Sequence, residues 1–150
     1  MGTQAPYQSW GRYPTARPAR VQALRFRDQP LPRIPGSLLA FGNGRSYGDS
    51  CLNNGGTLLA TRGLDRFLAF DPATGLIRCE AGVLLSEVLS LTVGGGWFLP
   101  VTPGTRYVTI GGAIANDVHG KNHHLAGTFG HQVTRLELVP HDGRSRTISR

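Results

Sequence analysis

The sequence is poor in lysine, in cysteine and in long apolar runs, and each shortage narrows what the protein can be. Lys121 is the single lysine, so all the remaining residues among the 16 lysines and arginines are arginines. The two cysteines, Cys51 and Cys79, lack metal-type spacing and are interpreted as free thiols. No apolar run is long enough to span a bilayer, and the opening "MGTQAPYQSW" is polar, so we expect a cytoplasmic protein.

Acidic side chains are also scarce, which leaves a formal net charge of +7. Six arginines lie in the proline-containing N-terminal arm and the others are scattered. No basic helix, zinc finger or aromatic RNA-binding motif accompanies them. This distribution argues against nucleic acid as the partner, although a small basic polyanion-binding protein is kept as an alternative. A diphosphate ligand would use the same charge with fewer residues.

Glycine and proline, by contrast, are abundant, with 21 and 10 residues. The prolines before position 36 predict an irregular arm over residues 1–35, with one short strand or helical turn at 19–26. From 36 to 150 the sequence changes to short strands mixed with few helices. This pattern indicates a single α+β domain rather than a regular doubly wound sheet.

Apolar periodicity and turn residues predict the individual elements. Strands are expected at 37–41, 57–61, 97–105 and 133–140, and hairpins over 66–80 and around the turn 141–143. A helix is expected over 84–93, where apolar residues recur at helical spacing before three consecutive glycines. Thr109 is the expected N-cap of a short helix within 108–120.

Two glycine-rich stretches are the candidate ligand-binding segments. The first, "GNGRSYG" (42–48), follows a predicted strand, and its glycines allow backbone N–H groups to approach phosphate oxygens while Arg45 adds a fixed charge. The second, "PGTRYVTIGGAIANDVHG" (103–120), places glycines where a helix begins, and a helix N-terminus suits a diphosphate. Each stretch alone is equally compatible with a surface turn, but the pair predicts one extended ligand held along its length.

The segment "HGKNHH" (119–124) joins three histidines to the single lysine. With His131 these imidazoles are numerous enough to bind zinc, but Gly120 disfavours a helix here and no H-E-x-x-H motif is present. We therefore predict no metal site. The simpler interpretation is that the histidines form hydrogen bonds with the loop backbone and orient one another.

Three motifs together resemble a known family: "GNGRSYGDS", "PGTRYVTIGGAIANDVHGKNHH" and "AGTFGHQV". They are similar to the PCMH-type FAD-binding domain of the vanillyl-alcohol oxidase flavoproteins, and most similar to the decaprenylphosphoryl-β-D-ribose 2-oxidase family. "SWGRYPTARPARV" (9–21) resembles the N-terminal arm of those enzymes. The resemblance implies a two-lobed α+β domain that wraps FAD between its lobes. The residues that it implies for cofactor binding are Gly44, Arg45, Ser46, Tyr47, Gly48, Pro103, Gly104, Thr105, Gly111, Gly112, Ala113, Asn116, His119 and Gly120.

The resemblance also implies a chemistry. The family oxidises the 2-hydroxyl of a polyprenyl-phosphate-linked ribose and passes hydride to flavin, which carries the redox work. His119 and Lys121 are the implied catalytic residues, beside the flavin and the substrate. Many relatives attach the flavin covalently through a histidine of the first loop. Tyr47 is the nearest matching position here, so non-covalent FAD is expected.

The family has more chain than 150 residues can hold, namely a later FAD segment and a C-terminal substrate-binding domain. We therefore expect this chain to be the N-terminal part of an oxidoreductase, incomplete and inactive alone, with the sugar or lipid-linked sugar bound mainly elsewhere. Contact with the inner membrane is expected only through a lipid-linked substrate. The alternative is a non-catalytic, truncated nucleotide-binding fragment.

Overall fold

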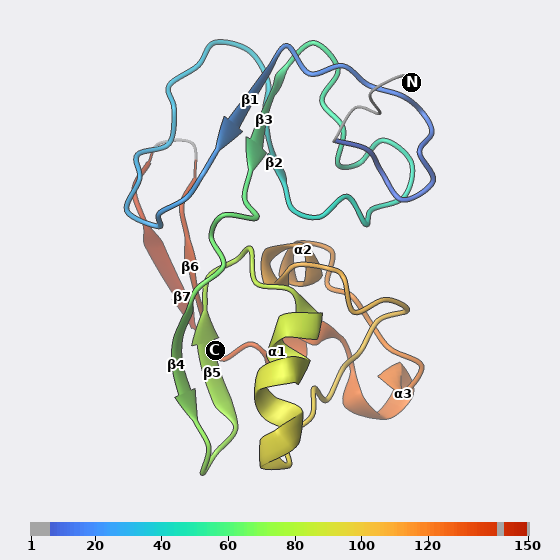
Figure 1. Cartoon of the computed structure of the whole chain (residues 1–150), viewed down its shortest axis with the longest axis vertical. Coiled ribbons are helices and arrows are strands. Elements are labelled where there is room, and N and C mark those ends of the chain that lie inside the picture. Colours follow the sequence, from blue (N-terminus) through green and yellow to red (C-terminus); the bar gives the residue numbers. More distant parts are fainter. Residues whose placement is uncertain (1–6, 141–142, 150) are drawn as a thin grey trace.

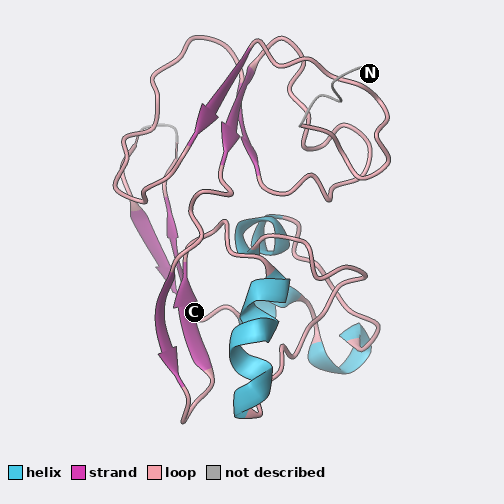
Figure 2. Ribbon diagram, in the orientation of Figure 1, coloured by secondary structure: helices cyan, strands magenta, loops and turns pink. Residues whose placement is uncertain are grey.

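The computed structural model describes residues 7–140 and 143–149, which form two lobes joined along one side (Figure 1). One lobe holds a small sheet with long loops. The other holds all the described helices together with two β-hairpins (Figure 2). None of the described helices is long and apolar enough to cross a membrane.

The first lobe is built on a three-stranded parallel sheet in the order β1-β3-β2. Its strands are β1 (Arg20–Ala23), β2 (Leu38–Phe41) and β3 (Thr57–Ala60). Loops connect these parallel strands, since no helix lies between them in the chain. The central strand is the most buried, with Leu58 only 1% exposed, and it packs near Phe41 and Cys51. Phe41, the last residue of β2, therefore starts the first glycine-rich loop from a fixed position.

The second lobe combines two antiparallel hairpins with short helices. The hairpins are β4 (Phe67–Asp71) with β5 (Leu76–Cys79) and β6 (Arg135–Leu138) with β7 (Arg146–Ser149). The helices are α1 (Leu85–Thr92), α2 (Ile110–Ala115) and α3 (His123–Ala126), with 3-10 turns η1 (Val93–Gly95) and η2 (Phe129–Gln132). The guanidinium of Arg78 lies 3.1 Å from the carboxylate of Glu137, which ties one hairpin to the other.

The core of the second lobe brings together side chains from α1, α2, η2 and the loop before Thr102. Leu85, Val101, Ala113 and Phe129 form its buried centre. Helix α1 turns Leu85, Val88 and Thr92 inward, at the spacing of one helical face. The N–H of Leu84 donates to the carboxylate of Glu87 at 2.7 Å, which helps to satisfy the start of this helix.

The structure confirms most of the predicted elements. The α+β class, the strands near 37–41, 57–61 and 133–140, the 66–80 hairpin and the helix near 84–93 are all present. Thr109 is the N-cap of α2, with its hydroxyl accepting the N–H of Gly112 at 3.1 Å. Within the predicted 19–26 element, β1 is a strand, and it pairs with β3, so part of the predicted arm belongs to the sheet. Turn residues 141 and 142 lie outside the described residues.

Two local predictions are wrong. Residues 97–105 form no strand. Pro100 and Pro103 have no N–H to give to a ladder, and Val101 is fully buried against the helices rather than paired in a sheet. The "KNHH" segment, where a helix looked poor, supplies the first half of the short helix α3, which starts at His123, beyond Gly120.

Candidate functional site

The first glycine-rich loop, residues 42–48, leaves the end of β2 in a conformation that suits an oxygen-rich ligand. Gly44 and Gly48 have φ values of 61° and 57°, a region that residues with a Cβ rarely adopt. A Cβ on Gly44 would also meet the backbone carbonyl of Gln8. Among the described residues, the backbone N–H of Ser46 donates to the sulfur of Cys51, whereas the other N–H groups of 43–48 donate no hydrogen bond. This loop therefore presents a row of free donors.

The side chains of this loop point to different neighbours. The guanidinium of Arg45 stacks over the ring of Trp10, 5.4 Å from its centroid. Ser46 accepts the N–H of Trp10 at 2.9 Å through its carbonyl and also forms hydrogen bonds with Cys51. Tyr47 is 79% exposed. Ser46 thus anchors the loop, while the guanidinium of Arg45 forms no ion pair with the described residues.

The start of α2 does not have the free donors that the sequence predicted. Its first four N–H groups donate, in order, to Val83 O at 2.7 Å, Ala81 O at 2.7 Å, Thr109 Oγ1 at 3.1 Å and Thr109 O at 2.8 Å. Gly111 and Gly112 therefore offer a diphosphate no unpaired amide. Ala113 is fully buried in the core and offers no surface to a ligand. The glycines instead allow close packing: a Cβ on Gly111 would lie 3.0 Å from that of Ala81.

The two glycine-rich stretches are nevertheless brought together across the lobes. The side-chain amide of Asn43 donates to the carbonyl of Tyr107 at 2.7 Å. Gly42 lies so close to Thr109 that a Cβ on it would be 2.6 Å from the threonine hydroxyl. These contacts join residues more than sixty positions apart, and they fix the distance between the first loop and the segment leading into α2.

A hollow of about 690 Å³ lies at the other end of the second stretch. It is lined by Thr102, Pro103, Gly104, His119, Gly120, Lys121, Asn122 and His123. Five of the predicted site residues, from two separate segments, thus meet here. The N–H groups of Lys121 and Asn122 have no acceptor among the described residues, and Lys121 has no carboxylate partner there. The hollow is therefore electropositive.

The histidines of this loop orient one another. The ring of His119 lies edge-on to that of His123 at 5.4 Å, and His123 lies edge-on to His124 at 5.9 Å. Nδ1 of His123 is 3.2 Å from the carbonyl of Gly120. The side chain of Asn122 donates to Pro100 O at 3.0 Å and holds the loop to the 100–104 segment. Residues 7–140 and 143–149 contain no cluster of three or more histidine, cysteine, aspartate or glutamate side chains that could hold a metal ion.

Asp117, which the sequence did not single out, fixes the chain just before His119. Its φ is 41°, and its Oδ1 accepts the N–H of Gly130 at 2.8 Å. That hydrogen bond, followed by one from Thr128 and the charges of His131 and His119, lowers the pKa of the Asp117 carboxyl. The signal available in the sequence was an Asp two residues before a histidine in a glycine-rich turn.

The remaining predicted residues take supporting positions. Asn116 ends α2 and donates its side-chain amide to Gly112 O at 2.8 Å. The hydroxyl of Thr105 accepts the N–H of Tyr107 at 3.2 Å. Sequence reasoning missed the arm residues Gln8, Ser9, Trp10 and Arg12, which lie against the first loop. An aromatic residue and an arginine on either side of a glycine, in an otherwise polar arm, were the available signal.

Comparisons with known proteins agree with this arrangement. A family model described as an FAD binding domain matches residues 33–149. Decaprenylphosphoryl-beta-D-ribose oxidase of Mycolicibacterium smegmatis is 44% identical over 112 residues, which cover 75% of this chain and 24% of that protein. Delta(24)-sterol reductase of Homo sapiens is 36% identical over 76 residues, which cover 51% of this chain and 15% of that protein. The chain thus spans a quarter or less of these relatives.

One solved structure supports the fold. Alkyldihydroxyacetonephosphate synthase matches with a TM-score of 0.61 over 75% of this chain and 22% of that one. At 17% identity this likeness concerns the fold alone.

Proposed function

The chain belongs to the FAD-binding domain family, and from this premise we propose that it holds FAD non-covalently as part of an oxidoreductase. The observation that carries the proposal is the group of free N–H donors at residues 43–45, beside the guanidinium of Arg45, which forms no ion pair with the described residues. A diphosphate needs donors of this kind, and backbone amides supply them without a side chain. The positive φ of Gly44 and Gly48 makes that surface accessible.

The site divides its work between the two segments. In this proposal the first loop takes the diphosphate, because the amides of α2 are already engaged. The glycines of α2 would then contribute only a smooth surface. Pro103, Gly104 and the 119–122 loop, which line the second hollow, would face the reacting end of the cofactor.

When bound, FAD supplies the redox chemistry by accepting a hydride from the substrate. The protein must stabilise the negative charge that develops and accept the proton of the substrate hydroxyl. The ammonium group of Lys121 has no counter-ion among the described residues and would serve the first need. The imidazole of His119, on the same hollow, would serve the second.

The substrate that we propose is a sugar hydroxyl, specifically the 2-hydroxyl of a polyprenyl-phosphate-linked ribose. The support is the 44% identity to a protein named for decaprenylphosphoryl ribose oxidation. Because the chain covers 24% of that relative, most of the substrate contacts are proposed to come from outside these 150 residues. Any membrane contact would come through the lipid portion of the substrate.

The cofactor proposal is tested by titrating FAD into the purified chain and following the quenching of flavin fluorescence. Arg45→Gln is expected to weaken binding by about tenfold or more, since a charge-assisted contact to phosphate is lost. Arg27→Gln, which removes an equal charge from an exposed position of the arm, is the matched control and should bind as the original chain does. Equal affinity for all three proteins would remove the first loop from the site.

The non-covalent link is tested separately by acid precipitation of the FAD-loaded protein. We expect the flavin to remain in the supernatant, because Tyr47 occupies the position of the linking histidine. Flavin retained in the washed pellet would contradict this part of the proposal.

A further inference from the structure

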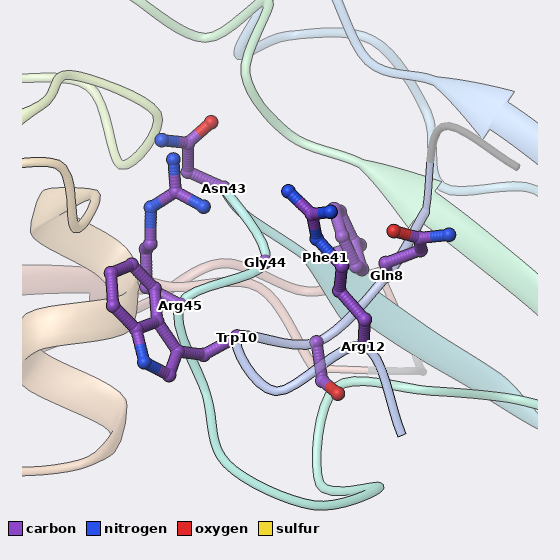
Figure 3. Close-up of a pocket in the computed structure, with 8 residues that line it drawn as sticks. Gln8, Trp10, Arg12, Phe41, Asn43, Gly44 and Arg45 are labelled. Carbon is purple, nitrogen blue, oxygen red and sulfur yellow. The ribbon is translucent and has the colours of Figure 1, made fainter. Parts of the chain in front are cut away.

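A second hollow, of about 580 Å³, lies between the arm and the first loop (Figure 3). It is lined by Gln8, Ser9, Trp10, Arg12, Phe41, Asn43, Gly44 and Arg45. Figure 3 shows the side chains of Arg12 and Arg45 on either side of Gly44, with Trp10 next to Arg45. Half of this lining comes from arm residues that the family resemblance does not assign to cofactor binding.

The hollow contains a buried hydroxyl that has no partner among the described residues. Ser9 is 4% exposed, and its Oγ makes no hydrogen bond with any of them. A buried hydroxyl in this condition is unfavourable, and native proteins almost always satisfy such groups with protein, water or ligand. Because Ser9 lines the hollow, a ligand oxygen placed there can supply the missing partner.

The charge of the hollow points to the sign of that ligand. No carboxylate lines it, and neither Arg12 nor Arg45 forms an ion pair within residues 7–140 and 143–149. Two guanidinium groups without counter-ions, beside a hydroxyl donor, are the groups that bind phosphate most effectively. The free N–H groups of Gly44 and Arg45 belong to the same wall.

The arm is held in place to form this wall. The N–H of Trp10 donates to the carbonyl of Ser46 at 2.9 Å, and the ring of Tyr7 meets that of Phe41 edge-on at 5.2 Å. Gly44 has no Cβ, so the backbone of Gln8 can pass directly over the loop. Ser9 therefore lies between two anchored residues rather than on a free tail.

From these observations we propose that the hollow is a phosphate-binding site in which the Ser9 hydroxyl and the Arg12 and Arg45 guanidinium groups hold one phosphate group. The phosphate belongs either to the diphosphate of the cofactor or to a phosphorylated substrate. The inference rests on the proposed function in that Arg45 and the amides of the first loop belong to both, and it adds Ser9 and Arg12 of the arm. Inorganic phosphate tests it separately from FAD.

Trp10 makes the test direct, because Trp10 and Trp97 are the two tryptophans of the chain. In a Trp97→Phe background, inorganic phosphate is titrated at constant ionic strength while Trp10 emission is followed, with calorimetry on the unsubstituted chain as a second measurement. We expect a saturable change. Ser9→Ala should weaken phosphate binding by roughly fivefold, and Arg12→Gln by roughly tenfold or more. Arg27→Gln is the matched control and should leave it within about twofold.

The thermal stability of Ser9→Ala separates a ligand-binding hydroxyl from a structural one. Without phosphate, its Tm should equal or exceed that of the original chain, because an unpaired buried hydroxyl has been removed. With phosphate, it should gain less in Tm than the original chain does. A lower Tm without phosphate and an unchanged phosphate affinity would overturn the proposal, as would the absence of any saturable response to phosphate.

Repeating the titration on FAD-loaded protein identifies the source of the phosphate. If FAD blocks inorganic phosphate, the hollow receives the diphosphate of the cofactor. If phosphate still binds beside FAD, the hollow receives a phosphorylated substrate. If phosphate binds but FAD does not, the phosphate site stands and the proposed function fails.

Discussion

Gly42 is the point at which the first loop comes nearest to Thr109, and Gly42→Ala should force these two segments apart. The added Cβ would lie 2.6 Å from Oγ1 and 3.3 Å from Cγ2 of Thr109, closer than ordinary van der Waals contact. Thr109 cannot easily move, because it is 3% exposed and its hydroxyl caps α2 through the N–H of Gly112 at 3.1 Å. The substitution therefore disturbs the loop and the cap together.

The expected energies follow from these contacts. Overpacking of this kind costs about 1–3 kcal/mol in the free energy of unfolding. Thr109→Ala alone should cost about 1 kcal/mol through loss of the cap. In the double variant, both close atoms are gone and the nearest remaining atom, Cβ of residue 109, lies at an ordinary 3.5 Å. The double variant should thus be less destabilised than the sum of the single changes, by about 1–3 kcal/mol.

The assay is a double-mutant cycle by urea denaturation, with FAD affinity measured on the same four proteins. Gly42→Ala should also weaken FAD binding, and Thr109→Ala should restore part of that loss. Gly94→Ala is the control, because Gly94 has an ordinary φ and nothing lies within 4 Å of its added Cβ. Additivity within about 0.5 kcal/mol would refute a direct contact between the first loop and Thr109.

Three further predictions concern single side chains. In the catalytically active enzyme, Lys121→Ala should slow flavin reduction by roughly 100-fold in anaerobic stopped flow, with little change in FAD affinity. Lys121→Arg should not restore the rate fully. Unaltered reduction rates in both variants would show that Lys121 has no catalytic role. The pKa of Asp117 is lowered in the folded protein, so its contribution to stability is present above the unfolded pKa of 3.8 and is lost as pH falls through the folded pKa. Asp117→Asn should therefore reduce the fall in Tm on the acid side. Identical curves of Tm against pH for the two proteins would contradict this. Burial, followed by the charge of Glu80, raises the pKa of Cys79 from 9.0 to about 11. In the Cys51→Ala variant at pH 9, iodoacetamide should therefore alkylate Cys79 at least about tenfold more slowly in the folded protein than in the urea-unfolded protein. Equal rates would show an ordinary thiol.

The sequence was sufficient to predict those elements that are formed by interactions between neighbouring residues. The β4–β5 hairpin follows from the "DPATG" turn, in which Asp71 accepts hydrogen bonds from Ala73 N–H and the Thr74 hydroxyl. Helix α1 follows from apolar spacing, and the start of α2 follows from the Thr109 side chain. Each of these depends on residues within one or two turns of chain, so periodicity and turn chemistry were sufficient. The strand predicted over 97–105 is absent for the opposite reason. Helices distant in the sequence pack on this segment and bury it, whereas its composition suggested a strand paired in a sheet.

The sequence by itself also determined which loops matter, through motifs that resemble an FAD-binding domain, and the comparisons confirm that family. Only the tertiary structure decided which groups are free to bind. The N–H groups of Gly111 and Gly112 are engaged by Ala81 and Thr109, while those of residues 43–45 have no partner in the part of the chain that the structure describes. The partner of Gly111, Ala81, comes from a distant part of the chain, and no local pattern specifies it. For the same reason the orphaned Ser9 hydroxyl could be found only after the arm was seen folded against the loop that follows β2.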